Sequence, residues 1–339
     1  MKIKYPNVIK KGDTIGITAV SSKAMPQRLD LAEENLRKMG YRVRETSNVR
    51  TGEKLVSSTG EIRTKEFMEL WEDKNITYIM AARGGEFLME MLTSLNKERR
   101  SLKKIAPKWV QGYSDTSLLL FYLTTNYNIA TIHAENLSGY ALKEMHCSVI
   151  NSLNMAGLEK GEKYSQKSFD KYSKKYDTGE YNLVYELTEK VKYKTINGKR
   201  RFKLEGRMLG GCIGVINKII GTKYDNTKKY IKQFKEGTLW YLENCELSVL
   251  DLYRALWQMK EAGWFENTKG FLFGRTMSNK AVEDFTYLDA ISKALGSYNV
   301  PIVYDIDLGH VPPQLTFVNG SYGVFEYDRG RALLKQTYK

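Results

Sequence analysis

A serine stands where a short apolar segment runs directly into an apolar helical pattern, in the stretch 108–119 that reads KWVQGYSDTSLL. Ser114 and Asp115 are residue types that cap a helix N-terminus, and capping alone could account for them. The alternative is a nucleophile held on a sharp strand-to-helix turn, as in hydrolases with a catalytic serine. A serine hydroxyl attacks well only when a base, usually a histidine oriented by a carboxylate, removes its proton. The two interpretations therefore differ in whether the chain supplies such a pair.

The chain contains three histidines, which limits the candidates for the base. His310 lies in YDIDLGHVPPQLTF, after an apolar strand pattern and between Gly309 and Pro312. A histidine on such a rigid loop at a strand end is well placed to act as a base, although a structural role also fits. His133 ends the run NIATIHAE and is either a pocket residue or a satisfied core histidine. His146 lies beside a helical pattern and is the weakest candidate.

Glu243, in the segment LWYLENCE, is the best match for the carboxylate that would orient the base. It closes a strand of bulky apolar residues, where a charge is costly unless it is paired. Glu246 precedes a helical pattern, and a helix-start role explains it. Ser114, Glu243 and His310 then follow the order that α/β-hydrolases use for their triads.

The elements that must position these side chains are predicted to form a parallel sheet in the first half of the chain. Apolar runs of strand type alternate there with helical patterns, and the runs cover residues 14–20, 76–82, 108–113 and 128–135. Such an alternation is typical of a parallel sheet with helices on both faces and functional residues at the carboxyl ends of the strands. Arg83-Gly84-Gly85, Ser114 and His133 all fall at such ends.

The second half resumes the α/β alternation with the strand patterns GTLWYLEN, GFLFGRT and VPIVYDIDLG. We therefore expect an α/β chain with an N-terminal domain over residues 1–158 that carries the serine. A basic, tyrosine-rich crossover over residues 159–203 is expected next, and then a C-terminal α/β domain over residues 204–339 with the glutamate and the histidine. Within the crossover, Asn197-Gly198 predicts a β-hairpin.

The net charge of +14 raises the hypothesis of a nucleic-acid-binding protein. Residues 160–203 carry 13 Lys or Arg against 6 Asp or Glu, together with six tyrosines. Interleaved basic and aromatic residues can bind single strands, but no nucleic-acid-binding motif accompanies them. A solvated linker is the simpler interpretation, and a non-catalytic nucleic-acid-binding protein stays as a distant alternative. If the segment instead forms a rim over Ser114, then Lys171, Lys174 and Lys175 would select anionic substrates.

The composition points to a cytoplasmic protein. The N-terminal segment has no apolar stretch long enough for a secretory signal, and no stretch is long enough for a transmembrane helix. Cys147, Cys212 and Cys245 are far apart and odd in number, which argues against a disulfide framework and a zinc ribbon.

Five segments resemble the successive blocks of the LD-carboxypeptidase family of serine peptidases, which includes muramoyl-tetrapeptide carboxypeptidases and microcin C immunity peptidases. They are RGGEFLMEML, GYSDTS, EGRMLGGCIGVINKIIGT, LWYLENCE and DIDLGHVPPQLTFVNG, in the family's order and over nearly the whole chain. The resemblance implies a flavodoxin-like or glutamine-amidotransferase-like parallel-sheet domain followed by a smaller C-terminal α/β domain. It also implies a homodimer and no metal or cofactor.

The resemblance further implies a serine carboxypeptidase with the triad Ser114, Glu243 and His310. The oxyanion hole would consist of the backbone N–H groups of Gly85 and Asp115. The expected reaction is hydrolysis of an L,D-amide bond, such as the one that releases the terminal D-alanine of murein tetrapeptides. The alternative substrate is an aminoacyl nucleotide analogue, as for microcin immunity peptidases, so we expect a small peptide or peptidyl-nucleotide as the ligand.

Arg83, Gly84, Glu86 and His133 are the candidates for the substrate pocket. Two features depart from familiar patterns. Many carboxypeptidases of the family carry an aromatic residue after the RGG turn, where this chain has Glu86, and a negative charge there is unfavourable beside a substrate carboxylate. Thr116 stands where the G-x-S-x-G turn of hydrolases has its second glycine.

Overall fold

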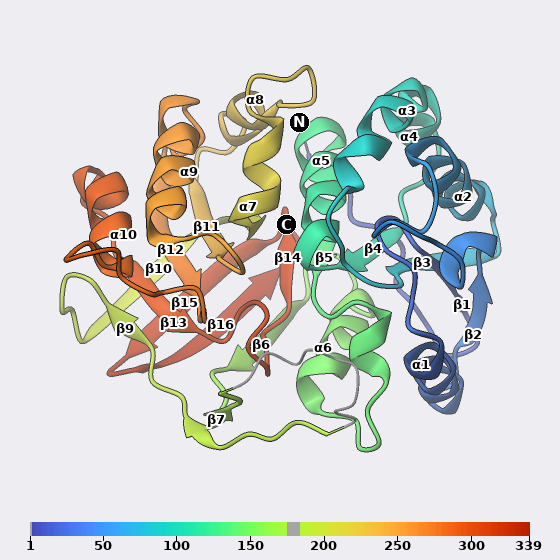
Figure 1. Ribbon diagram of the computed structural model, residues 1–339, viewed down its shortest axis with the longest axis horizontal. Helices are drawn as coiled ribbons and strands as arrows, with labels where there is room; N and C mark the ends of the chain where they lie inside the picture. The colour runs from blue at the N-terminus through green and yellow to red at the C-terminus, as the bar shows by residue number, and fades with distance from the viewer. Residues whose placement is uncertain (1, 175–183) are drawn as a thin grey trace.

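Two β-sheets form the frame of the computed structural model, which describes residues 2–174 and 184–339 (Figure 1). The strands are β1 (Thr14–Thr18), β2 (Arg42–Glu45), β3 (Ile76–Ala81), β4 (Trp109–Gly112), β5 (Thr131–His133), β6 (Lys163–Lys167), β7 (Lys171–Tyr172), β8 (Glu189–Lys190), β9 (Lys194–Thr195), β10 (Arg201–Cys212), β11 (Thr238–Glu243), β12 (Thr268–Gly274), β13 (Ile302–Ile306), β14 (Phe317–Asn319), β15 (Tyr322–Asp328) and β16 (Arg331–Thr337). One sheet has the order β14-β5-β4-β3-β1-β2 and the other has the order β6-β16-β15-β10-β11-β12-β13-β9, while β7 and β8 form a separate pair.

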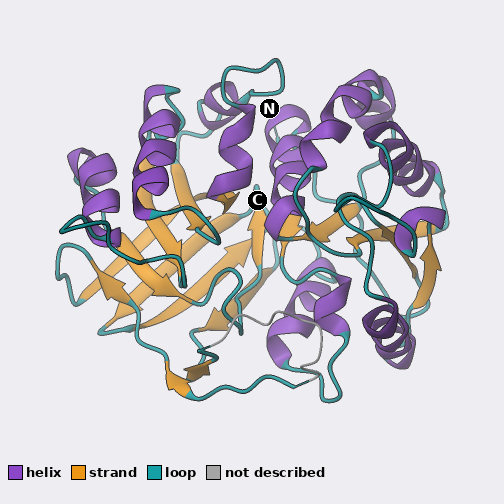
Figure 2. Cartoon of the chain, viewed as in Figure 1, coloured by secondary structure: helices purple, strands orange, loops and turns teal. Residues whose placement is uncertain are grey.

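Helices cover the sheets as the sequence pattern predicts. The α-helices are α1 (Pro26–Lys38), α2 (Gly60–Glu72), α3 (Met91–Lys97), α4 (Arg99–Lys104), α5 (Ser117–Tyr127), α6 (Cys147–Ala156), α7 (Ile213–Ile216), α8 (Thr227–Ile231), α9 (Val249–Glu261) and α10 (Tyr287–Leu295). Short 3₁₀ helices are η1 (Ser47–Val49), η2 (Leu88–Glu90), η3 (Ser114–Thr116), η4 (Leu137–Tyr140), η5 (Asn217–Ile219) and η6 (Gly296–Tyr298). Figure 2 shows helices on both sides of the first sheet, whereas α7, α8, α9 and α10 gather on one side of the second.

The first sheet is parallel from β2 through β1, β3 and β4 to β5, which confirms the predicted parallel-rich α/β fold. Its last strand, β14, comes from the C-terminal part of the chain and pairs antiparallel with β5. The turn at Asn319-Gly320 therefore leads from one sheet into the other, where β15 pairs with β10. A strand from the expected C-terminal domain thus belongs to the sheet of the expected N-terminal domain. The domain boundaries at residues 158 and 203 stay predictions.

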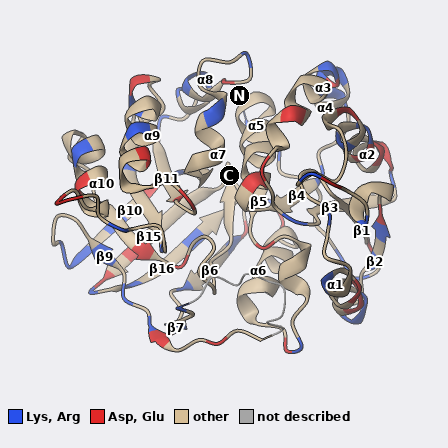
Figure 3. Cartoon of the chain, viewed as in Figure 1, with Lys and Arg blue, Asp and Glu red and all other residues tan. Residues whose placement is uncertain are grey.

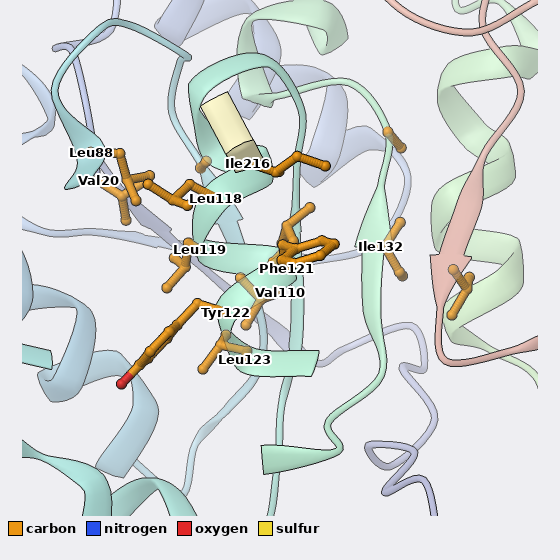
Figure 4. Packing of buried hydrophobic residues seen from close by; sticks show 14 of the residues in the cluster. Val20, Leu88, Val110, Leu118, Leu119, Phe121, Tyr122, Leu123, Ile132 and Ile216 are labelled. Carbon is orange, nitrogen blue, oxygen red and sulfur yellow. The ribbon is translucent and has the colours of Figure 1, made fainter. Parts of the chain in front are cut away.

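Helix α5, which follows Ser114, is the centre of the core (Figure 4). Each of its residues except Asn126 is buried, as expected for a helix that is apolar on all sides and enclosed by other elements. Phe121 stacks on Trp264 of the second half with 5.0 Å between ring centroids. The helix behind the nucleophile candidate is therefore fixed by both halves of the molecule.

The predicted hairpin at Asn197-Gly198 is wrong. The chain turns there, but β9 pairs with β13 at the edge of the second sheet, while β10 lies between β15 and β11. An Asn-Gly signal reports only the local turn. The partner of β10 is decided at long range, where Leu204 faces Phe325 in register and both side chains are buried.

Two properties of the surface bear on the function. Figure 3 shows Lys and Arg beside Asp and Glu along the outer helices and loops. In the part of the chain that the structure describes, no helix is both long enough and apolar enough to cross a bilayer.

We predict that Gly210→Ala destabilises the protein, because β10 and β11 approach so closely that a Cβ at residue 210 would overlap the Tyr241 carbonyl oxygen. Backbone cannot yield as a side chain does, so the free energy of unfolding should fall by about 3 kcal/mol. The matched control is Gly214→Ala in α7, where the nearest atom lies 3.5 Å from the added Cβ. Urea unfolding measures both variants, and equal midpoints for them would contradict the prediction.

Candidate active site

Ser114 sits on a strained turn between a buried strand and a buried helix. It follows β4 closely and has a φ of +60°, a left-handed conformation that is costly for a residue other than glycine. The Asn136 side chain holds this turn, because its Oδ1 accepts the Tyr113 N–H at 3.2 Å. Gly112 has no space for a side chain, since a Cβ would lie 2.5 Å from the Thr116 methyl group. Gly112 and Thr116 thus provide the close packing for which hydrolase turns use a second glycine.

The Ser114 hydroxyl contacts His310 and caps no helix N–H among the described contacts. Its Oγ lies 3.0 Å from Nε2 of His310, and Nδ1 of His310 donates to Oε2 of Glu243 at 2.9 Å. His310 comes from the loop after β13, and Glu243 is the last residue of β11. The structure therefore brings together the three side chains that the sequence singled out.

Gly309 allows the close approach between the histidine loop and Glu243. Its φ is +96°, and a Cβ at this position would overlap Oε2 of Glu243. Glycine adopts this backbone conformation freely and leaves space for the carboxylate. His310 remains partly open to the cavity, with 17% of its side chain exposed, while Glu243 is 1% exposed.

The two charged groups shift each other's pKa in opposite directions. Burial alone would raise the pKa of Glu243, but the charge and the hydrogen bond of His310 bring this pKa below its ordinary value. Burial alone would lower the pKa of His310, but the adjacent Glu243 carboxylate raises it well above the usual 6.5. Each group therefore favours the charged form of the other.

His133, expected in the substrate pocket, does not line it. The residue is fully buried, and its Nε2 lies 3.6 Å from Oε1 of Glu243. The reason is the pairing of β14 with β5, which places Phe317 beside His133 in register. Burial lowers the pKa of His133 to about 4, so this imidazole is neutral behind Glu243.

A cavity of about 930 Å³ opens over Ser114 and His310. Its lining includes the pocket candidates Arg83, Gly84 and Glu86 and the oxyanion-hole candidate Gly85. Sequence reasoning missed the other charged lining residues, which are Lys23, Arg28, Glu53, Lys54, Glu135 and Glu246. Only their place in the sequence could have revealed them. The segments that line the cavity each follow the carboxyl end of a strand in one of the two sheets.

Glu86 stands at this cavity as an exposed carboxylate near two others. Partial burial raises its pKa, and the charges of Glu246 and Asp115 raise it further. The cavity therefore carries both positive and negative groups around the serine. Among the described residues, no three or more His, Cys, Asp or Glu side chains are grouped so that they could hold a metal ion.

The glycine turn after β3 lies directly against the nucleophile candidate. A Cβ on Gly84 would be 2.9 Å from Cβ and 3.0 Å from Oγ of Ser114. Gly85 follows with a φ of +157°, and a Cβ there would overlap the hydroxyl oxygens of Ser21 and Ser22. The backbone of this turn can therefore approach a substrate carbonyl bound at Ser114.

The described part of the basic crossover docks on the histidine loop instead of lining the cavity. Phe169 N–H donates to Oδ2 of Asp307 at 2.8 Å, and Ser173 N–H donates to the Pro312 carbonyl at 2.9 Å. Lys171 and Lys174 do not line the cavity, and Lys175 lies outside the described residues.

Comparisons with known proteins show the family of the chain. The model of the LD-carboxypeptidase N-terminal domain matches residues 15–134, and the model of the C-terminal domain of that family matches residues 205–323. A probable murein peptide carboxypeptidase of Bacillus subtilis is 21% identical to this chain, over 93% of this chain and 89% of the carboxypeptidase chain. The microcin C7 self-immunity protein MccF of Escherichia coli is 23% identical over 96% of this chain and 94% of the MccF chain.

Solved structures share the fold. MccF in complex with glutamyl sulfamoyl guanosine superposes with a TM-score of 0.83 at 20% identity, over 98% of each chain. A muramoyltetrapeptide carboxypeptidase from Oxalobacter formigenes gives a TM-score of 0.73 at 18% identity, over 96% of this chain and 98% of its own.

We predict that the pKa values of His310 and His133 differ widely. His310 should stay protonated as the pH rises past 6.5, and His133 should stay neutral until the pH falls to about 4. Glu243→Gln should lower the pKa of His310, because burial then acts without the opposing charge. NMR titration of the imidazole Cε1–H signals measures these values, and a wild-type His310 that titrates at or below 6.5 would contradict the ion pair.

The same shifts fix the pH range in which the pair stabilises the fold. The raised pKa of His310 contributes stability at low pH that is lost as the pH rises through that pKa. The lowered pKa of Glu243 contributes stability above its ordinary 4.5 that is lost as the pH falls. The pair therefore contributes most to the free energy of unfolding at pH values above the lowered pKa of Glu243 and below the raised pKa of His310.

Proposed function

The chain belongs to the LD-carboxypeptidase family and is a serine-type carboxypeptidase, and we propose that it hydrolyses an L,D-amide bond through Ser114, His310 and Glu243. The observation that carries the proposal is the continuous hydrogen-bonded chain from the Ser114 hydroxyl through the His310 ring to the buried Glu243 carboxylate. These three hydrogen-bonded side chains lie at a cavity large enough for a short peptide.

In the proposed mechanism, neutral His310 accepts the hydroxyl proton while Ser114 Oγ attacks the scissile carbonyl carbon. The Glu243 carboxylate stabilises the imidazolium that forms and fixes the tautomer in which Nδ1 carries a proton. Backbone N–H groups of Gly85 and Asp115 would stabilise the oxyanion. His310 then protonates the leaving amine, and a water molecule activated by the same ring hydrolyses the acyl-enzyme.

The pKa of His310 sets the conditions for this cycle. A protonated imidazole cannot act as the base, and the carboxylate of Glu243 raises the pKa of His310 well above 6.5. The proportion of enzyme that carries the neutral base therefore increases with pH through that pKa. The same carboxylate strengthens the base once the ring is neutral, so turnover should increase as the pH rises through the pKa of His310.

A murein tetrapeptide that ends in D-alanine is the substrate we propose first. The names of the Bacillus subtilis and Oxalobacter formigenes relatives support a murein peptide. The cavity suits a zwitterionic peptide, because Arg83 and Lys54 offer cations for carboxylates while Glu86 and Glu246 offer carboxylates for ammonium groups. The raised pKa of Glu86 makes a nearby substrate carboxylate less unfavourable.

An aminoacyl nucleotide analogue is the second candidate. MccF was solved in complex with glutamyl sulfamoyl guanosine and with aspartyl sulfamoyl adenosine. The cavity volume of about 930 Å³ accommodates this candidate as well, since it lies near the upper end of the range for small-molecule sites. Lys23 and Lys54 at the cavity would attract a phosphate or a sulfamate.

We predict that Ser114→Ala abolishes hydrolysis and leaves the fold intact. Loss of a triad nucleophile costs on the order of 10⁴ to 10⁶ in kcat. Ser117→Ala is the matched control, because that hydroxyl is buried in the first turn of α5 and has no hydrogen-bond partner among the described contacts. Steady-state release of D-alanine measures both. If Ser114→Ala keeps more than a tenth of wild-type turnover, Ser114 is not the nucleophile.

We predict that the purified protein releases D-alanine from murein tetrapeptide in preference to cleaving aspartyl sulfamoyl adenosine, and that chelators leave the rate unchanged. Mass spectrometry of both reactions in parallel gives the ratio of kcat/KM values. A higher kcat/KM for the nucleotide analogue would contradict the murein tetrapeptide as the preferred substrate and would leave the proposed mechanism unchanged. Inhibition by EDTA that added divalent metal reverses would contradict the metal-free mechanism.

A further inference from the structure

The side chain of Asp115 links the nucleophile turn to the glycine turn. Asp115 follows Ser114 directly and is 2% exposed, so its carboxylate is buried. Its Oδ2 accepts the Ser21 hydroxyl proton at 2.5 Å and the Leu88 N–H at 2.9 Å. Leu88 begins η2, three residues after Gly85. One carboxylate oxygen therefore joins the turn of Ser114, the loop after β1 and the segment that follows Gly85.

Ser21 connects the same carboxylate to Gly85 itself. A Cβ on Gly85 would overlap the Ser21 hydroxyl oxygen, so this oxygen lies against the Gly85 backbone. The neighbouring Ser22 N–H donates to the Gly84 carbonyl at 3.2 Å. Asp115 thus holds the hydroxyl that packs on Gly85, and it also holds the N–H of Leu88 beyond Gly85.

Arg63 of α2 fixes the far side of this segment. The guanidinium is fully buried, and Nη1 donates to the carbonyls of Phe87 and Val20 at 3.1 Å each. Burial raises the pKa of Asp115 above its ordinary value, and the hydrogen bonds from Ser21 and Leu88 together with the Arg63 charge offset only part of that rise. The segment is held from the α2 side by Arg63 and from the nucleophile side by Asp115.

We propose that the Asp115 carboxylate is a positioning residue that sets the spacing of the oxyanion hole, because it ties the turn carrying the Asp115 N–H to the turn carrying the Gly85 N–H. This inference rests on the proposed function, in which those two N–H groups bind the oxyanion. Donors must lie within about 2.7–3.1 Å of the oxyanion, and a displacement of about 1 Å can cost on the order of 100-fold in rate. A residue that couples the two donors therefore acts on the transition state more than on the bound substrate.

An ionised carboxylate suits this role better than its neutral isostere. Oδ2 faces two donors, and bonds to a charged acceptor are roughly twice as strong as bonds to a neutral one. Asn at position 115 would keep the volume, but its amide oxygen accepts more weakly and its NH₂ group is itself a donor. Asp115→Asn should therefore loosen the link between the turns without creating a cavity.

The test compares Asp115→Asn and Ser21→Ala with Asp225→Asn as the matched control. Asp225 also accepts one backbone N–H, from Thr227 at 2.9 Å, and one side-chain N–H, from Trp264 at 3.0 Å, and it does not line the catalytic cavity. Circular dichroism and thermal unfolding first establish that each variant is folded. Ser21→Ala removes only one bond to the carboxylate and so serves as the milder variant if Asp115→Asn does not fold.

Four quantities are then measured: kcat and KM for D-alanine release from murein tetrapeptide, and the affinities for two ligands. One ligand is a murein tripeptide with a boronic acid in place of its C-terminal carboxyl, which forms a tetrahedral adduct with Ser114. The other is the intact tetrapeptide, bound to the same variants in a Ser114→Ala background. We expect kcat to fall about 10- to 100-fold with KM within about twofold. Affinity for the boronic acid should fall in parallel with kcat/KM, whereas tetrapeptide affinity and the control variant should not change.

The outcomes separate this inference from the proposed function. Folded Asp115→Asn and Ser21→Ala variants with wild-type kcat and boronic acid affinity would overturn the inference and leave the triad in place. A parallel loss of affinity for the boronic acid and the tetrapeptide would also overturn it, because the carboxylate would then shape the pocket in general. Wild-type turnover that survives Ser114→Ala would overturn the proposed function and this inference with it.

Discussion

The negative charge of Glu243 in an almost solvent-free position is the constraint on which the site depends. A buried carboxylate is tolerated only when it is paired, and His310 provides the pairing with a 2.9 Å hydrogen bond. A second imidazole, that of His133, lies 3.6 Å from the other carboxylate oxygen. Because burial lowers the pKa of His133 to about 4, one positive charge and not two faces the carboxylate. The positive charge is thereby assigned to the histidine that also reaches Ser114.

This pair meets the serine because two sheets are joined at their strand ends. Glu243 and His310 follow β11 and β13 of one sheet, Ser114 follows β4 of the other, and β14 pairs with β5 of the first sheet just after the histidine loop. The Asn319 side chain reinforces the junction, since its Oδ1 accepts the Gly210 N–H at 3.0 Å and the Tyr241 hydroxyl proton at 2.7 Å. Loops from both sheets therefore line one cavity.

The local pattern of the sequence was enough to predict the parallel sheet, the strand-to-helix turn of Ser114 and the positions of Glu243 and His310. These features depend on residue types within one segment, such as a charge that closes an apolar strand. The pairing of β14 with β5 could not be predicted in this way, because it joins segments more than 180 positions apart, beside an Asn319-Gly320 turn that resembles a hairpin signal. The burial of His133 depends on that pairing, so the sequence alone could not decide between the pocket role and the core role that were open for this residue. The mixed charges of the cavity were equally inaccessible, since they come from several loops that meet only in the fold.

We propose that Ser114 is a nucleophile activated by a histidine whose pKa is raised by a buried carboxylate. Reaction of the folded protein with a fluorophosphonate, followed by peptide mapping in a mass spectrometer across a range of pH, tests this most directly. We expect one phosphonyl group on Ser114, with a labelling rate that increases with pH through an apparent pKa above 6.5. A protein that hydrolyses peptide but carries no label at Ser114, or one labelled at the same rate on either side of that pKa, would contradict it.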